Sequence, residues 1–237
     1  MVSIDITRAL AGIAGIALAG SLVACSADES GSSADSTAVT SSSAAASETS
    51  GANSTPELAA PELTATASVG QADAPVRVVK FADLRCPYCA VFSHDMMPVI
   101  QEYVDAGDAR VDLYDVAILG KDSERASTAL RAAGEQGKYT EFEKEAFSRF
   151  GMGEHPEWTV EELVDVATVA GVPDIALFES RIGAKDLQEA VEKDTKAAIA
   201  AGLQSVPTVF VGSAELESMD QAQLRDLIES ELATLAK

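Results

Sequence analysis

The sequence predicts an α/β fold with a helical insertion, and three observations support this prediction. An apolar, β-branched stretch at residues 76–81 runs into a helix start that carries Cys86 and Cys89. A second strand-like stretch at 109–116 is followed by a long block of helical pattern. Residues 204–212 then read as a turn followed by a short buried strand. The order is therefore β-α-β, a helical block, and α-β-β-α.

The first residues have the pattern of an export signal. One basic residue, Arg8, precedes an apolar run at 9–24 that is about as long as a signal core and short for a membrane span. The run ends in Leu-Val-Ala before Cys25, which resembles the bacterial lipobox, where the cysteine is diacylated and becomes the first mature residue. We predict a lipoprotein signal peptide at 1–24. The alternatives are an ordinary secretory signal and an uncleaved anchor helix, and each places most of the chain outside the cytoplasm.

A flexible tether is expected at residues 25–67, with the folded domain at 68–237. Ser and Thr fill 15 of the 30 positions from 26 to 55, so this stretch cannot bury enough apolar surface to offset the entropy of ordering it. The whole chain carries a formal net charge of −21. Such an acidic surface argues against nucleic acid or an anionic membrane surface as the main partner.

The helix that carries the cysteines is expected to start at Cys86 and to run to about Asp105. Pro98 should kink it, because proline removes a helical hydrogen bond. Gly107 should end it, since glycine adopts the left-handed conformation that closes a helix. Residues 69–75 form a polar, turn-forming entry to the first strand.

The helical insertion is expected at about 120–184, between the second strand and the strand that follows Pro207. Apolar residues at helical spacing predict helices at 123–134, 139–150, 159–171 and 173–183, and a further one at 186–201. Thr159 and Glu162 form a capping box that opens the third of them. A weak strand at 214–217 should form a hairpin with the strand before it, and Asp220 should cap a final helix.

Two cysteines three residues apart at a helix start are typical of a redox site. The helix N-terminus favours a thiolate, so Cys86 should be the reactive sulfur, with Arg85 and Lys80 adding positive charge. Cys89 lies one turn deeper and should resolve the mixed disulfide. If Cys25 is lipidated, no other cysteine remains in the chain.

Three other interpretations of the pair remain. A plain stabilising disulfide would close a loop too short to constrain the unfolded chain much. A zinc site would need His94 and His155, whose spacing fits no known finger. A Cu(I) site could use Met96 and Met97, although methionine at helical spacing more often packs a core. We predict no metal, and we assign no chemistry to Trp158.

At this point the sequence resembles the DsbA-type branch of the thioredoxin superfamily. The matching segments are Asp73-Ala74-Pro75-Val76 before the first strand, Phe81-x-Asp83-x-x-Cys86-Pro87-Tyr88-Cys89 at its end, and Val206-Pro207-Thr208 before a Val-Phe-Val strand. The resemblance covers about residues 68–237 and implies a thioredoxin-like fold. One position departs from the family pattern, because Lys80 stands where many relatives carry an acid.

The resemblance also implies the roles of several site residues. Pro207 should be cis and lie opposite the cysteines, with Val206 and Thr208 beside it as substrate-binding residues. The backbone of Val206 would pair with an extended substrate segment. The residues expected to tune the redox site are Pro87, Tyr88, Lys80 and Asp83.

The function implied by the resemblance is extracytoplasmic oxidation of cysteines in exported proteins by the Cys86/Cys89 pair. No cofactor is expected. The implied partners are the exported substrates and a membrane redox protein, quinone-linked as in the family, that reoxidises the pair. We expect a monomer held to the cell membrane by its lipid. A reductase or isomerase of the same fold, or a thioredoxin-like Cu(I) carrier, are the alternatives.

Overall fold

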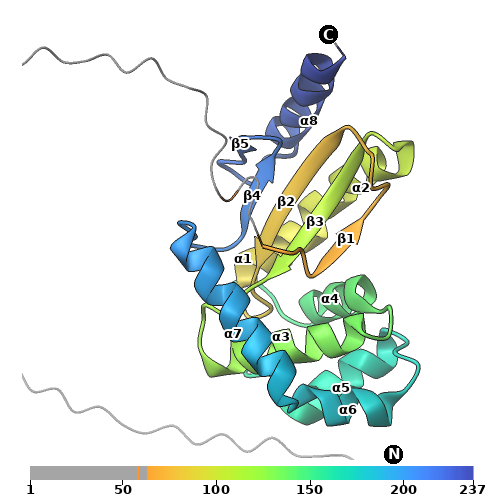
Figure 1. Ribbon diagram of the computed structural model, residues 1–237, viewed down its shortest axis with the longest axis vertical. Coiled ribbons are helices and arrows are strands. Elements are labelled where there is room, and N and C mark those ends of the chain that lie inside the picture. Colours follow the sequence, from red (N-terminus) through yellow and green to blue (C-terminus); the bar gives the residue numbers. More distant parts are fainter. Residues whose placement is uncertain (1–57, 59–62, 237) are drawn as a thin grey trace, which may run out of the picture. The chain divides into compact units, whose positions relative to one another are not determined.

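A mixed sheet of five strands in the order β1-β3-β2-β4-β5 forms the centre of the fold (Figure 1). The strands are β1 (Ala67–Val69), β2 (Val76–Ala82), β3 (Ala109–Asp115), β4 (Thr208–Val211) and β5 (Ala214–Glu215). β2 pairs with β3 in parallel and with β4 in antiparallel orientation. β1 and β5 are antiparallel additions at the two edges.

The structure is a computed structural model that describes residue 58 and residues 63–236. The predicted signal peptide, Cys25 and most of the predicted tether lie outside these residues. The described residues fall in one unit, Gly51–Lys237. Within them, no helix is both long enough and apolar enough to cross a membrane.

The central strand β2 is buried on both faces, as expected for an apolar parallel strand. Because side chains alternate along a strand, its residues divide between two cores. Val78 and Ala82 join the larger core, and Val79 and Phe81 join the smaller one. Lys80, which lies between Val78 and Ala82, is only 1% exposed.

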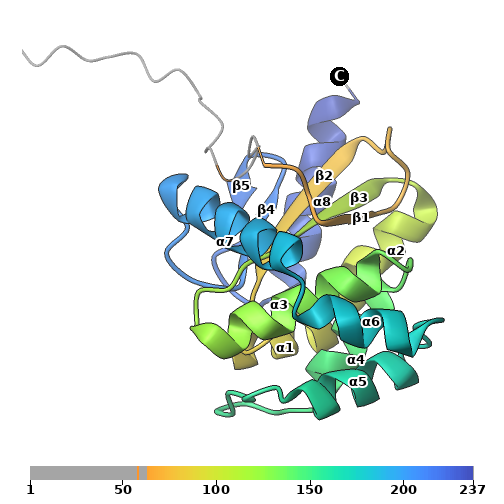
Figure 2. The same ribbon diagram turned by 60° about the horizontal axis from the view of Figure 1, so that its bottom comes forward.

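Helices cover both faces of the sheet (Figures 1 and 2). On one face lie α1 (Pro87–Val91), the π-helical turn η1 (Phe92–Met96), α2 (Met97–Ala106) and α8 (Gln221–Leu235). On the other face, Ala198 near the end of α7 (Lys185–Ala200) packs with Leu203 and the smaller core. The cysteine-bearing helix α1 thus lies at one end of the sheet, directly after β2.

The expected single helix from Cys86 is interrupted, although not where we placed the kink. Cys86 is the N-cap and the helix begins at Pro87. The irregularity is the π-helical turn η1, whereas Pro98 lies in the first turn of α2, where its missing N–H costs nothing. Gly107 ends α2 with a left-handed φ of 81°, so this prediction is confirmed.

The predicted helical insertion is confirmed. It contains α3 (Lys121–Gly134), α4 (Tyr139–Ser148), α5 (Val160–Val169) and α6 (Ile175–Ile182). Figure 2 shows α4, α5 and α6 gathered beyond one end of the sheet. The capping box at Thr159 is present, and Asp220 caps α8.

The folded part begins earlier than the predicted boundary at residue 68. Ala67 is already in β1, which pairs with β3, and the hydroxyl of Ser68 donates to Asp112 at 2.7 Å. Leu58 is buried in the smaller core, with Leu63 packed against it. The sequence signal was weak because β1 has three residues and follows a polar stretch.

Candidate active site

Cys86 and Cys89 lie where the chain leaves β2 and enters α1. Cys86 is the N-cap of α1 and Cys89 is in its first turn. Both are free thiols, 5% and 2% exposed respectively. The sulfur of Cys86 donates to the carbonyl oxygen of Val206 at 3.3 Å. The structure therefore brings together the two motifs that the sequence placed 120 residues apart.

The two thiols differ in acidity. The hydrogen bond from Cys89, together with backbone N–H groups of Cys89 and Tyr88, lowers the pKa of Cys86 to about 7 despite its burial. Burial raises the pKa of Cys89 well above its ordinary value, and its hydrogen bond to Cys86 adds to that rise. Near neutral pH, Cys86 is thus partly thiolate while Cys89 holds its proton. This is the division of roles that disulfide exchange needs.

The loop opposite the cysteines contains a cis peptide bond between Val206 and Pro207. β4 begins at Thr208, which pairs with Phe81 near the end of β2, and this register carries the loop to the cysteines. The hydroxyl of Thr208 donates to the carbonyl of Ser205 at 2.8 Å. Thr208 therefore stabilises the loop, and the Val206 carbonyl is the group that contacts the sulfur of Cys86.

The residues between the cysteines have unequal exposure. Pro87 is buried in the first turn of α1, whereas Tyr88 is 55% exposed. Pro87 also lines a hollow of about 390 Å³, together with Val91 on the same helix and Phe150 and Met152 after α4. Tyr88 and Met152 give the surface beside the cysteines an apolar character.

Lys80 is buried and paired with an acid from the insertion. Its Nζ lies 2.8 Å from Oε2 of Glu143 on α4, and 5.9 Å from the centre of the Phe147 ring. Its charge lowers the pKa of Cys89, although burial outweighs this effect. We expected Lys80 to act on Cys86, and its identified effect is instead on the deeper sulfur. Glu143 was missed because it is 63 residues away in sequence.

Asp83 fastens the loop before α1 to the loop after β3. Its carboxylate accepts hydrogen bonds from the backbone N–H groups of Arg85 at 2.9 Å, Ile118 at 3.0 Å and Leu119 at 3.1 Å. Burial raises the pKa of Asp83. The charge of Asp83 also raises the pKa of Cys86, so this acid opposes thiolate formation while it holds the loop in place.

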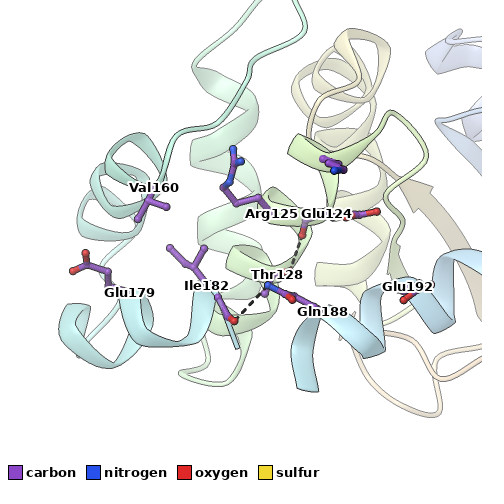
Figure 3. A pocket seen from close by; sticks show the side chains of 10 residues that line it. Glu124, Arg125, Thr128, Val160, Glu179, Ile182, Gln188 and Glu192 are labelled. Atoms are coloured by element: carbon purple, nitrogen blue, oxygen red, sulfur yellow. Dashed lines mark hydrogen bonds between the residues drawn. The ribbon is translucent and has the colours of Figure 1, made fainter. Parts of the chain in front are cut away.

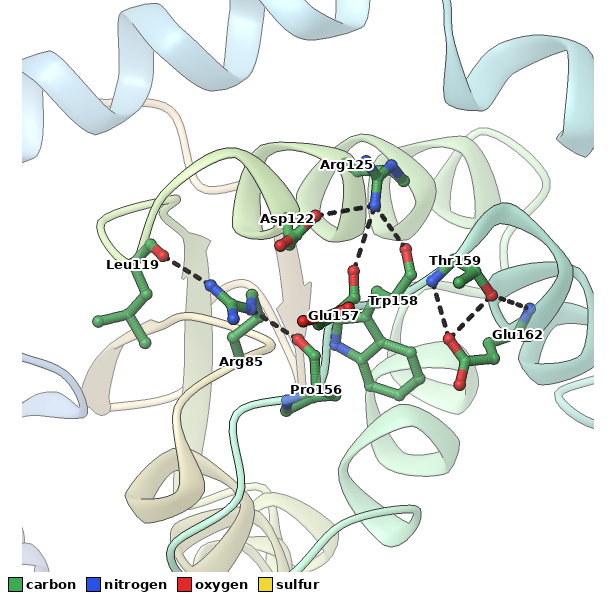
Figure 4. A network of polar contacts seen from close by, with 9 residues as sticks. All are labelled: Arg85, Leu119, Asp122, Arg125, Pro156, Glu157, Trp158, Thr159 and Glu162. Atoms are coloured by element: carbon green, nitrogen blue, oxygen red, sulfur yellow. Dashed lines mark hydrogen bonds and ion pairs between the residues drawn. The ribbon is translucent and has the colours of Figure 1, made fainter.

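The side chain of Arg85 binds backbone carbonyl oxygens, a role that we did not expect. Its guanidinium donates to the carbonyl oxygens of Leu119 at 2.7 Å and Pro156 at 2.6 Å (Figure 4). We predicted that its charge would favour the Cys86 thiolate. The side chain instead bridges the two loops on either side of the cysteine motif.

Two residues to which we had assigned no redox role also hold this loop. The indole N–H of Trp158 donates to the carbonyl of Leu84 at 3.0 Å, and Nδ1 of His155 lies 2.9 Å from the carbonyl of Arg85. Figure 4 shows the segment of Trp158 held in turn by Arg125 on α3. Local sequence patterns could not reveal these contacts, since their partners lie at least 70 residues apart.

The candidate metal ligands are dispersed in the described part of the chain. Met96 is fully buried in the larger core, as its helical spacing predicts, and His94 is exposed and paired with Asp95. No group of three or more His, Cys, Asp or Glu side chains in residue 58 or residues 63–236 is arranged to hold a metal ion.

A hollow of about 690 Å³ lies between helices of the insertion and α7 (Figure 3). Its charged lining includes Arg125, Glu179 and Glu192. Neither cysteine nor any residue of the Val206 loop lines it.

Comparison with known proteins agrees with this geometry. The family described as Thioredoxin matches residues 62–230. Probable disulfide bond formation protein D of Bacillus cereus is 30% identical over 170 residues, which cover 70% of this chain and 78% of that protein. The crystal structure of oxidised BdbD from Bacillus subtilis has a TM-score of 0.65 and 28% identity, covering 70% of this chain and 92% of that one. The crystal structure of DsbA from Chlamydia trachomatis has a TM-score of 0.64 and 21% identity. The match covers 72% of this chain and 93% of that one, and the two share the fold.

Proposed function

Because this chain belongs to the thioredoxin family as a disulfide oxidoreductase of the DsbA and BdbD type, we propose that Cys86 and Cys89 are its redox pair and that it oxidises cysteines of exported proteins. The observation that carries the proposal is the unequal acidity of the two sulfurs. Cys86, with a pKa of about 7, touches the Val206 carbonyl, while Cys89 is buried behind it with a raised pKa.

The reaction begins from the Cys86–Cys89 disulfide. A substrate thiolate attacks the sulfur of Cys86, the Cys86–Cys89 bond breaks, and its electron pair leaves on Cys89. The second substrate thiolate then attacks the substrate sulfur of the mixed disulfide. A disulfide forms in the substrate and Cys86 leaves as a thiolate. Since a thiol of lower pKa is a better leaving group, the depressed pKa of Cys86 favours this oxidising direction.

Substrate binding is assigned to the loop opposite the cysteines. Val206 and Pro207 would present backbone to an extended substrate segment, and Thr208 would hold the loop. Exposed Tyr88 adds an apolar contact beside the reactive sulfur, and Pro87 fixes the helix start.

The proposed setting is outside the cytoplasm. A signal peptide at 1–24, a lipid on Cys25 and the tether that follows would hold the domain at the cell membrane as a monomer. The relatives named disulfide bond formation proteins support disulfide formation as the activity. Catalytic turnover requires reoxidation of the pair, for which we propose a quinone-linked membrane protein. No nucleic-acid role is proposed.

The test is oxidation of a reduced dithiol peptide, with the reduction potential of the pair measured alongside. We expect the oxidised wild-type chain to oxidise the peptide, and C86S and C89S to be inactive because neither can form the Cys86–Cys89 disulfide. Mixed instead with the oxidised peptide, C89S should accumulate a mixed disulfide through Cys86. A potential as low as that of thioredoxin, about −270 mV, would argue for a reductase and against this proposal. Tight Cu(I) binding without peptide oxidation would favour the copper-carrier alternative.

A further inference from the structure

The two carbonyl groups that precede Cys86 are both bound by one loop of the insertion. The indole N–H of Trp158 donates to the carbonyl of Leu84 at 3.0 Å, and Nδ1 of His155 lies 2.9 Å from the carbonyl of Arg85. The oxygen ends of both carbonyl dipoles are therefore directed at this loop. Because a carbonyl oxygen disfavours a nearby thiolate, their direction matters for the sulfur that follows them.

Trp158 makes its contact from a strained backbone conformation. Its φ is 47°, and among the residues that the structure describes it is the one non-glycine residue with a positive φ. Such a conformation is unfavourable for a bulky residue and persists only where the surroundings hold it firmly. The ring is 3% exposed and meets Phe150 edge-on, with centroids 6.0 Å apart. The strained turn thus places a buried indole where its N–H meets the Leu84 carbonyl.

Arg125 on α3 fastens the strained turn. Its Nη1 donates to the carbonyl of Trp158 at 2.9 Å, and it pairs with Asp122 at 2.9 Å (Figure 4). The residue after the turn, Thr159, is the N-cap of α5 and forms the capping box there. The turn is therefore held between α3 and α5. Since Arg125 binds the backbone of Trp158, we expect it to act on Cys86 through the indole.

We propose that Trp158 and Arg125 are positioning residues for Cys86, which form a clamp that keeps the preceding carbonyls turned away from its sulfur. The inference rests on the proposed redox role of the Cys86/Cys89 pair and adds the residues that hold the reactive sulfur in place. At the N-cap, this sulfur is reached by the backbone N–H groups of Tyr88 and Cys89. Release of the loop would let the sulfur leave these donors and approach a carbonyl oxygen.

The clamp acts on the step in which Cys86 is the leaving group. When the second substrate thiolate attacks the mixed disulfide, the substrate disulfide forms and the bond to Cys86 breaks. The electron pair of that bond stays on the Cys86 sulfur, so no further oxidant or reductant takes part. A sulfur held beside N–H donors accepts this charge more readily than one beside a carbonyl oxygen. The clamp therefore favours oxidation of the substrate.

The titratable groups near Cys86 act separately from the clamp. The hydrogen bond from Cys89 lowers the pKa of Cys86, and the charge of Asp83 raises it. The charge of Lys80 acts on Cys89. His155 contacts the same loop and is kept in every variant of the test. The indole N–H is uncharged, so its own effect on the sulfur does not titrate.

The first test is W158F, which keeps an aromatic ring in the core and removes the N–H donor. All forms, the wild type included, are full chains that carry C25S, so that Cys86 and Cys89 are the only thiols. The ultraviolet absorbance of the thiolate is titrated in the reduced protein, with the oxidised protein as the blank. We expect W158F to raise the midpoint of Cys86 by about one pH unit, which is the order of one hydrogen bond.

Exchange with glutathione adds a readout that a general loss of stability would not change. The equilibrium between the protein disulfide and its dithiol is measured for W158F and wild type in the same glutathione mixtures. At about pH 6, Cys86 is protonated in both reduced proteins, so the two equilibria should agree. At about pH 9, the W158F disulfide should be about tenfold harder to reduce, because its thiolate has lost one pKa unit of stabilisation.

R125M provides an independent variant, since it releases the turn and leaves the indole in place. It should raise the midpoint in the same direction, and R125M/W158F should raise it no further than W158F. If W158F does not fold, R125M carries the same measurements. R181M is the matched control, because Arg181 on α6 pairs with Glu135 and Asp186 at the surface. It should keep the wild-type midpoint.

Two results would overturn the clamp and leave the oxidase role intact. One is a wild-type midpoint in variants that urea unfolding shows to be folded. The other is a change in the glutathione equilibrium that is the same at about pH 6 and about pH 9. Conversely, a midpoint that depends on Trp158 in a chain that oxidises no protein would support the clamp and overturn the oxidase role.

Discussion

At the scale of single residues, two identical side chains three positions apart have opposite acid–base behaviour. Cys86 caps the helix, where backbone N–H groups and the Cys89 thiol donate to it, and its pKa falls to about 7. Cys89 is one turn deeper, where burial raises its pKa well above the ordinary value. The difference comes from position on the helix. Cys86, at the N-cap, lies beside the unpaired backbone N–H groups of the first turn, whereas the side chain of Cys89 faces the core.

This difference makes the stability of the reduced protein depend on pH. Below about pH 7, Cys86 is protonated in the folded and the unfolded chain and contributes nothing. Between about 7 and the unfolded value near 9.0, only the folded chain has lost the proton, so stability rises with pH. We therefore expect the free energy of unfolding of the reduced wild type, relative to C86A, to increase from pH 6 to pH 9.

Denaturant unfolding of both reduced proteins across this range checks the expectation. A difference between them that does not change with pH would contradict a depressed pKa at Cys86. Measurements stop at pH 9 because Cys89 has the opposite shift. Its raised pKa removes stability at higher pH, once the unfolded chain has lost that proton and the folded chain has not.

At the scale of elements, the helical insertion does more than extend the fold. Its loops and helices hold the segment from Asp83 to Cys86 through Leu119, Pro156 and Trp158. Glu143 on α4 pairs with Lys80 on β2, and α4 packs against α1, the helix that carries Cys89. The cysteine motif is therefore positioned from two sides, by β2 and the Val206 loop on one and by the insertion on the other.

The insertion is joined to the sheet by a buried charge network. Nε of Arg131 on α3 lies 3.0 Å from Asp115 at the end of β3, and its Nη1 lies 2.7 Å from Asp194 on α7. R131M would leave the Asp115 carboxylate buried without the Arg131 guanidinium that pairs with it. We therefore expect a loss of about 3–5 kcal/mol in the free energy of unfolding. Urea titration measures it.

Arg181 provides the matched control for Arg131. It pairs with Glu135 and Asp186 at the surface, so R181M should leave the urea midpoint nearly unchanged. Equal effects of the two substitutions would mean that the Arg131 network does not hold the insertion to the sheet.

The helices and strands were predictable where the pattern is local. Neighbouring residues alone indicate the strand β2 by its apolar run, the start of α5 by the capping box at Thr159, and the end of α2 by Gly107. The π-helical turn η1 and the short strand β1 were not predictable, because packing against distant elements determines both. The same limit applies at the site, where Cys86, Cys89 and Pro207 lie in motifs while Glu143 becomes a partner of Lys80 only in the folded chain.

At the scale of the whole molecule, the predicted leader decides where the domain works. If Cys25 is lipidated, the wild-type protein should be recovered in the membrane fraction and C25S should be released from it. Fractionation of cells expressing each form measures this. A C25S protein that remains fully membrane-bound would argue for an uncleaved anchor helix instead.

The chain contains one tryptophan, and Trp158 is held within hydrogen-bonding distance of the loop that leads into Cys86. All intrinsic tryptophan emission therefore comes from an indole ring anchored to the carbonyl of Leu84, two residues before Cys86. The ring also makes an edge contact with Phe150, with centroids 6.0 Å apart, and is 3% exposed. Forming a Cys86–Cys89 disulfide would remove the charge of the Cys86 thiolate two residues from this anchor, so we expect tryptophan emission to differ between the reduced and the oxidised protein, and fluorescence spectra of the two forms measure this.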